Sequence, residues 1–222
     1  MAALPQPQTI ESVARGFLKS AFLAERAARI AALGEWIAGF AELRGTACDR
    51  RAIEAAAWFQ DSWCCADLHA GRFLAPLVLS TQPTEWQREQ AADIMQRVLA
   101  EVVDEPTRET AARAIREAGR RKIAMPEAMV LAEATNLDSI GPLWLCAQVA
   151  RCAAEDRPLG SAVAAWERQI EYQYWAGRIA ETLRFERSRR LARHRCAALE
   201  QFMAGLRDQL AGGDRHVAPE NP

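Results

Sequence analysis

The strongest constraint on the fold of this chain is its enrichment in residues that favour helices. Ala, Leu, Arg and Glu dominate the sequence, and all four are good helix formers. Runs of Val, Ile and Thr, which favour strands, are absent. No alternation of apolar and polar residues is long enough to predict a half-buried strand. The sequence therefore predicts an all-α fold.

Caps and breakers divide the chain into its expected helices. Thr9 is a candidate N-cap for the first helix, and Thr84 with Gln87 forms a capping box for a later one. Pro126 suits the first turn of a helix, and Gly141-Pro142 separates two others. We expect the main helices over residues 22–43, 50–59, 106–118, 161–183 and 186–210.

The composition suits one domain. The 222 residues are 50% hydrophobic and 26% charged, so the chain can bury a sizeable core. We expect a single-domain helical bundle over residues 9–210, between disordered termini at residues 1–8 and 211–222. The chain start lacks the basic residues and apolar run of a signal peptide, and no apolar segment approaches the ~20 residues that cross a bilayer. We therefore expect a cytoplasmic protein with no membrane partner.

Charge and cysteine usage narrow the classes of partner. The formal net charge of -1 argues against nucleic acid as the main partner, because phosphate binding needs a basic excess. The arginine run 184–195 is interpreted as a solvated helix face with pairs such as Glu186 with Arg190. The 6 cysteines form no Cys-x-x-Cys pair, and Cys64 and Cys65 are adjacent. Reduced, mostly buried thiols are the expectation.

Three segments carry the functional signal of the sequence. Residues 55–61 read Ala-Ala-Ala-Trp-Phe-Gln-Asp, which places an amide and a carboxylate after an apolar helix. Residues 126–141 read Pro-Glu-Ala-Met-Val-Leu-Ala-Glu-Ala-Thr-Asn-Leu-Asp-Ser-Ile-Gly. The third segment, near the end of the chain, contains Leu191-Ala192, Arg195 and several aromatic residues.

Together these segments resemble the HD superfamily of metal-dependent phosphohydrolases, in its small bacterial branch. In that branch an apolar helix ends in His-Asp, and a later helix reads Glu-Ala-x-x-Leu-x-x-Ala-Asp-x-Leu-Asp-x-Ile-Gly. A closing helical pair carries Leu-Ala-x-x-Arg. The resemblance extends over about residues 9–210 and implies an HD-like helical bundle.

The resemblance also implies that the metal site of the family has been replaced. The family holds a divalent cation with two histidines and two aspartates, and a metal-bound water attacks a phosphate ester. Arg26 and Gln60 stand at the two histidine positions, and Thr135 stands at the final aspartate. Asp61 alone is kept, and a further family histidine falls on Ala118. One carboxylate cannot hold a catalytic ion in a defined geometry, so a pseudoenzyme without a cofactor is expected.

The replacements suggest a charge substitution. A buried Asp61 without a metal would be an uncompensated charge, and an arginine can supply the missing positive charge. We expect Arg26 to pair with Asp61, with Gln60 and Thr135 hydrogen-bonded beside them. The simpler interpretation of Asp138 is that it braces the turn before Gly141.

The leading functional prediction is a binding or regulatory module for a small anionic ligand such as a nucleotide or phosphate. Its candidate ligand-binding residues are Arg26, Arg29, Asp61, Asn136 and Asp138.

Two alternatives come from other classes of protein. One is an active metal-dependent phosphohydrolase acting on nucleotides or phosphate esters, which would need a divalent metal. The other is a purely structural homo-oligomer. A relocated metal site formed by Asp61, Asp67 and His69, together with Cys64 and Cys65, is a further candidate.

Overall fold

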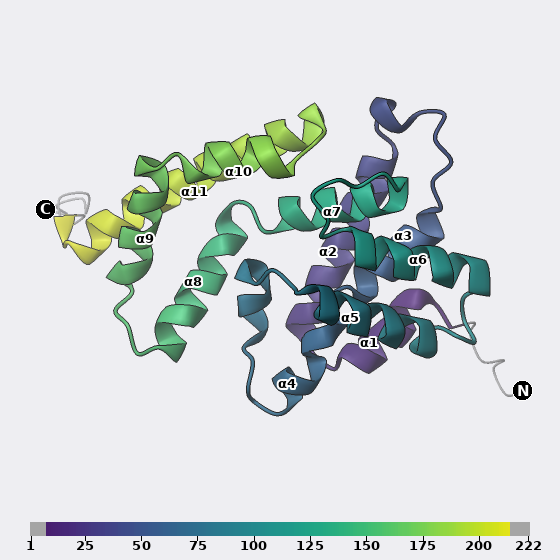
Figure 1. Cartoon of the computed structure of the whole chain (residues 1–222). Coiled ribbons are helices and arrows are strands. Elements are labelled where there is room, and N and C mark those ends of the chain that lie inside the picture. Colours follow the sequence, from purple (N-terminus) through teal and green to yellow (C-terminus); the bar gives the residue numbers. More distant parts are fainter. Residues whose placement is uncertain (1–7, 214–222) are drawn as a thin grey trace, which may run out of the picture. The chain divides into compact units, whose positions relative to one another are not determined.

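The computed structural model describes residues 8–213, and every regular element within them is a helix (Figure 1). The all-α prediction is confirmed. None of the helices in this part of the chain combines the length and the apolar character needed to cross a membrane. The termini predicted to be disordered, residues 1–8 and 211–222, fall outside the described residues except for residues 8 and 211–213.

The chain packs as two compact units, one ending at Asp138 and the other beginning at Ser139. The single domain expected over residues 9–210 stays a prediction. The first unit contains short 3₁₀ turns and seven α-helices among its described residues: α1 (Ile10–Leu18), α2 (Ala21–Ala38), α3 (Arg50–Phe59), α4 (Cys65–His69), α5 (Glu85–Val98), α6 (Glu105–Glu117) and α7 (Pro126–Asp138).

Local chemistry explains where the helices of the first unit begin. Thr9 caps α1 in a capping box with Ser12, and Thr84 caps α5 in a capping box with Gln87. The side chain of Asp49 accepts a hydrogen bond from the backbone of α3. Each cap satisfies backbone N–H groups that have no partner inside their own helix. The predicted bounds of α3 agree with the structure, and those of α6 differ by one residue at each end.

The core of the first unit forms around α2, α3 and α7. Helix α2 packs on both α3 and α7, and α6 packs on α3, α5 and α7. The α7 helix is buried around most of its circumference, as expected for a helix enclosed by others. Gly34 lets α2 approach α3 closely, because a Cβ atom there would lie 2.9 Å from Cγ2 of Ile53. This packing brings the ends of α3 and α7 close to the middle of α2.

The second unit consists of α8 (Pro142–Ala154), α9 (Gly160–Glu171), α10 (Tyr174–Thr182) and α11 (Glu186–Leu210) within its described residues. Trp144, Trp166 and Trp175 form an aromatic cluster with ring centroids 5.6–5.8 Å apart. All three rings are buried, and edge-to-face contacts of this kind add to the stabilisation from burial alone.

Two sequence predictions in the second unit are wrong. The single helix expected over residues 161–183 is interrupted between α9 and α10, where Gln173 adopts a left-handed backbone with φ of 53°. No glycine or proline marks this break in the sequence. Glu186 pairs with Arg193, at 2.5 Å, rather than with Arg190.

The cysteines differ sharply in accessibility. Cys64, Cys65 and Cys152 are buried, Cys48 and Cys196 are partly buried, and Cys146 is exposed. Burial raises the pKa of Cys48, Cys65 and Cys196 to about 11, which disfavours the reactive thiolate. All six thiols are unpaired, and three of the six are buried, whereas the sequence predicted that most would be.

We therefore expect one fast-reacting thiol, Cys146, in the native protein. A chromogenic disulfide reagent should label one equivalent rapidly near neutral pH and all six after unfolding. Cys146→Ser should remove the fast phase, whereas Cys152→Ser should leave it unchanged. Rapid labelling of the Cys146→Ser variant would contradict this expectation.

Candidate functional site

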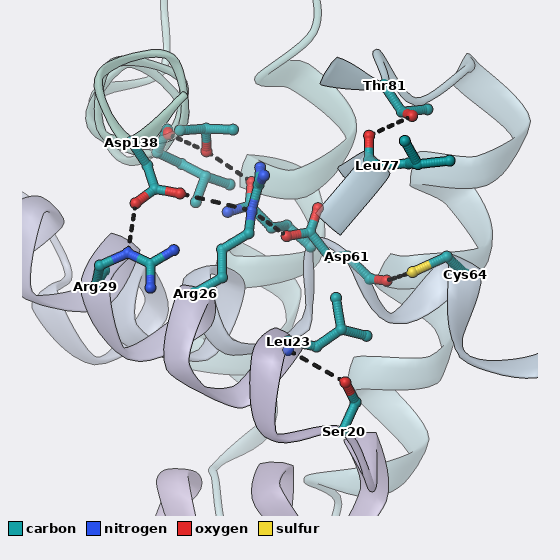
Figure 2. Close-up of polar contacts among 12 residues, drawn as sticks. Ser20, Leu23, Arg26, Arg29, Asp61, Cys64, Leu77, Thr81 and Asp138 are labelled. Atoms are coloured by element: carbon teal, nitrogen blue, oxygen red, sulfur yellow. Dashed lines mark hydrogen bonds and ion pairs between the residues drawn. The ribbon is translucent and has the colours of Figure 1, made fainter. Parts of the chain in front are cut away.

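The ion pair expected between Arg26 and Asp61 is present. Arg26 lies on α2, and Asp61 follows the end of α3. The Nε atom of Arg26 lies 2.8 Å from Oδ2 of Asp61 (Figure 2). The Arg26 side chain is only 3% exposed and that of Asp61 14%. The guanidinium therefore neutralises a carboxylate that is largely withdrawn from water.

A second pair extends this arrangement into a cluster of four charges. Asp138, at the end of α7, accepts a hydrogen bond of 2.9 Å from Nε of Arg29. Its other carboxylate oxygen lies 3.8 Å from Nε of Arg26. Figure 2 shows both arginines reaching from α2 toward these carboxylates. We call Arg26, Arg29, Asp61 and Asp138 the Arg–Asp cluster. Asp138 thus pairs with arginines, instead of serving only to brace the turn before Gly141.

Charge attraction holds the centre of the Arg–Asp cluster. Nε of Arg26 contacts Asp61 as an ion pair, and Nη1 of Arg26 is buried without a hydrogen-bond partner. Burial raises the pKa of Asp61 above its ordinary value, the positive charge of Arg26 lowers it, and the negative charge of Asp138 raises it. Desolvation outweighs the guanidinium, so the ionised form of Asp61 depends on Arg26 for its stability.

Gln60 and Thr135 lie beside the Arg–Asp cluster and contact each other. The hydroxyl of Thr135 lies 2.7 Å from Oε1 of Gln60 and 2.8 Å from the carbonyl oxygen of Leu131. The hydroxyl has one hydrogen and donates it to one of these acceptors at a time. This contact agrees with the expectation that the two residues form hydrogen bonds next to Asp61, and it connects the end of α3 to α7.

Replacing the Thr135 hydroxyl tests this connection. Thr135→Val keeps the shape of the side chain but leaves the buried amide of Gln60 without its partner, so the free energy of unfolding should fall by ~1–3 kcal/mol. Thr135→Ser keeps the hydroxyl and is the matched control. Urea unfolding of both variants measures the difference. Equal stability of Thr135→Val and wild type would show that the contact contributes nothing.

Three positions that the resemblance assigns to histidine or aspartate line one small cavity. Gln60, Thr135 and Ala118 contribute to its wall, as does Asn136 from the predicted ligand-binding set. The cavity has a volume of about 70 Å³. We call it the Arg88 cavity, because Arg88 on α5 also lines it.

The predicted ligand-binding residues thus lie in two places. Arg26, Arg29, Asp61 and Asp138 pair with one another in the Arg–Asp cluster and do not line the Arg88 cavity. Asn136 lies on the cavity wall. Sequence reasoning did not identify Arg88, since an arginine in the first turn of a helix gives no signal that distinguishes it from an ordinary surface residue.

The residues of the relocated metal site do not come together. Asp67 pairs with Arg72 at 2.6 Å, and Nε2 of His69 lies 3.2 Å from the carbonyl oxygen of Leu18. Asp61 pairs with Arg26. Over residues 8–213, no three His, Cys, Asp or Glu side chains are grouped so that they could hold a metal ion.

Comparison of the chain with protein-family models, with curated proteins and with solved structures finds no match. Function is therefore inferred from the chemistry of the site itself.

Proposed function

We propose that this chain is a non-catalytic HD-like protein that serves as a binding or regulatory module for a small anionic ligand such as a phosphate or nucleotide. One observation carries the proposal: a buried guanidinium, that of Arg26, lies 2.8 Å from Asp61. The resemblance assigns both residues to metal-ligand positions. A permanent positive charge there repels a metal ion. It also neutralises the Asp61 carboxylate in place of the ion.

Charge balance supports the proposal. Two arginines and two aspartates form the Arg–Asp cluster, so these four groups are neutral together when ionised, and the exposed Glu25 adds a further negative charge beside Arg29. A divalent cation added beside Arg26 would leave excess positive charge in a site with little access to water. Binding such an ion would have to overcome both the repulsion and the existing ion pairs.

The Arg88 cavity supports the binding role. Gln60, Thr135 and Ala118 come from three different segments and line one cavity. An amide, a hydroxyl and a methyl group can shape a pocket and form hydrogen bonds with a ligand. No His, Asp, Glu, Lys or Cys lines the cavity, so its wall has no general base to activate the Thr135 hydroxyl or a water for hydrolysis.

Metal content and turnover test the proposal together. Elemental analysis of the native protein should find no stoichiometric Mg, Mn, Fe or Zn. Nucleotides and phosphate esters should release no phosphate above the background of the Asp61→Ala variant, with or without added divalent metal. Metal-dependent phosphate release that Asp61→Ala abolishes would establish the active phosphohydrolase instead.

The cellular location is part of the same proposal. We propose a cytoplasmic protein, because its cysteines are unpaired in the structure and unpaired thiols are typical of a reducing compartment. Fractionation of cells followed by detection of the full chain tests this, and recovery in the membrane fraction would contradict it.

A further inference from the structure

We propose that the Arg88 cavity is the ligand site and that it receives a phosphate group, with the Arg88 guanidinium as the receptor for the negative charge. This inference deepens the proposed function by moving the recognition of the anion from Arg26 and Arg29 to a residue on α5. The two arginines of α2 are already neutralised by Asp61 and Asp138.

The wall of the cavity has the charge expected of an anion site. Arg88 is the one charged residue among those that line it, and the remaining polar residues are Gln60, Gln82, Thr135 and Asn136. Arg88 forms no ion pair with any carboxylate of the described residues. A half-buried guanidinium without a counter-ion is unfavourable unless an anion completes its environment.

The Arg88 guanidinium is held in place while one of its donors stays free. Nη1 of Arg88 donates a hydrogen bond to the carbonyl oxygen of Pro83, just before α5. Nε is shielded from solvent, whereas Nη2 is not shielded and has no hydrogen bond or ion pair within the described part of the chain, so Nη2 is the donor that can meet a phosphate oxygen. An arginine fixed through one nitrogen and free at another suits a phosphate oxygen, because charge-assisted hydrogen bonds to arginine are short and strong.

The position of the cavity on α5 adds to the attraction for an anion. Gln82 and Pro83 precede the Thr84 N-cap, and Arg88 lies in the first turns of the helix. The N-terminal end of a helix carries a partial positive charge that favours anions nearby. The dipole of α5 and the charge of Arg88 therefore act in the same direction.

Gly119 leaves the space that the guanidinium occupies. A Cβ atom at residue 119 would lie 2.3 Å from Cζ and from Nη1 of Arg88. A side chain at this position would displace the guanidinium, so the glycine is what allows Arg88 to lie where it does. Because the atoms in conflict belong to the end of a flexible side chain, the fold itself should tolerate a methyl group there.

The size of the cavity limits the ligand. Its volume of about 70 Å³ corresponds to roughly two water molecules at ~30 Å³ each. A single phosphate group is small enough for this volume, whereas the base and sugar of a nucleotide would have to lie outside the cavity. Free phosphate and a phosphate monoester share the recognised group.

Calorimetric titration of the full chain with inorganic phosphate and with adenosine 5′-monophosphate tests the site. Both probes should bind to wild type, and Arg88→Met should weaken binding at least tenfold, as expected for the loss of one charged hydrogen bond. Arg97→Met is the matched control, since Arg97 is an exposed arginine on the same helix. It should bind both probes as wild type does.

Gly119→Ala separates the position of the guanidinium from its charge. This variant keeps every charged group, but the new methyl group displaces the guanidinium of Arg88. Phosphate binding should weaken at least fivefold, while circular dichroism shows an intact fold. It also keeps the inference testable if Arg88→Met fails to fold.

The outcomes distinguish this inference from the proposed function. Phosphate binding that is unchanged in both Arg88→Met and Gly119→Ala overturns the assignment to the Arg88 cavity but leaves a binding module in place. A wild-type chain that binds neither probe overturns the inference, and metal-dependent turnover overturns the proposed function alone. Binding of adenosine 5′-monophosphate but not of free phosphate would identify the ester as the source of the recognised group.

Discussion

Arg26→Met should lower the free energy of unfolding by ~3–5 kcal/mol, because it removes one partner of a buried ion pair and leaves the other charge uncompensated. Asp61 and Asp138 would both lose the guanidinium between them, while only Asp138 would keep a second arginine, Arg29. Methionine fills much of the same volume, so the loss reports the charge more than a cavity. Urea unfolding monitored by circular dichroism measures the effect.

A second substitution shows whether the charge is responsible. In the Arg26→Met/Asp61→Asn double variant, the stranded carboxylate is replaced by a neutral amide, and more than half of the lost stability should return. Arg72→Met is the control, since the pair of Arg72 with Asp67 is exposed and worth about 0–1 kcal/mol. A double variant as unstable as Arg26→Met would mean that packing of the arginine, and not its charge, stabilises this region.

Acid should partly rescue the Arg26→Met variant. Burial already raises the pKa of Asp61 above 3.8, and loss of Arg26 removes the main influence that lowers it. A carboxyl group with a raised pKa in the folded state binds its proton more tightly there than in the unfolded chain. Its stabilising contribution is present below the unfolded pKa and is lost as the pH rises through the folded pKa. The stability difference from wild type should therefore shrink as the pH falls toward 3.8.

Gly141→Ala should destabilise the second unit by ~3 kcal/mol, from backbone strain together with overpacking. Gly141 has φ of 103° and ψ of -151°, a region that is essentially restricted to glycine. A Cβ atom there would lie 2.6 Å from Cβ of Arg195 and 3.3 Å from its carbonyl oxygen. Arg195 belongs to α11, so the helix backbone would have to move. Thermal unfolding followed by tryptophan fluorescence detects the loss through the cluster of Trp144, Trp166 and Trp175.

Gly177→Ala is the matched control for this experiment. Gly177 lies within α10, and a Cβ atom there would meet nothing within 4 Å. Alanine at an open helical position should stabilise by ~0.5–1 kcal/mol. The same Gly→Ala substitution is thus expected to lower stability at residue 141 and to raise it at residue 177. Equal effects of the two substitutions would show that the backbone at Gly141 tolerates a side chain.

Features set by neighbouring residues in the sequence were predictable. The caps at Thr9 and Thr84 depend on residues three positions away, and the bounds of α3 follow from a cap and an apolar run. The break at Gln173 had no such signal, because glutamine is an ordinary helix former. The left-handed conformation there accompanies the packing of α9 and α10 against α11, which the local sequence does not encode.

The candidate site was predictable only in part, for a similar reason. The pairing of Arg26 with Asp61 followed from charge balance between positions that the resemblance had linked. The pairing of Arg29 with Asp138 and the cavity beside Arg88 depend on how α2, α5 and α7 approach one another. The contact of the Arg88 guanidinium with Gly119 joins a surface-type arginine to a turn glycine. Neither an arginine nor a glycine at such positions predicts this contact from the sequence.

The Arg–Asp cluster has a consequence for how the first unit assembles. Arg29 and Asp138 are 109 positions apart in the sequence, so the buried Asp138 carboxylate meets its arginines only after the last helix of the unit has docked. An intermediate that lacks α7 would leave Arg29 with only its exposed partner Glu25, and it would leave Asp138 without either arginine. The cluster therefore makes arrival of the final helix a condition for closing the interior, which favours all-or-none assembly over stepwise accretion.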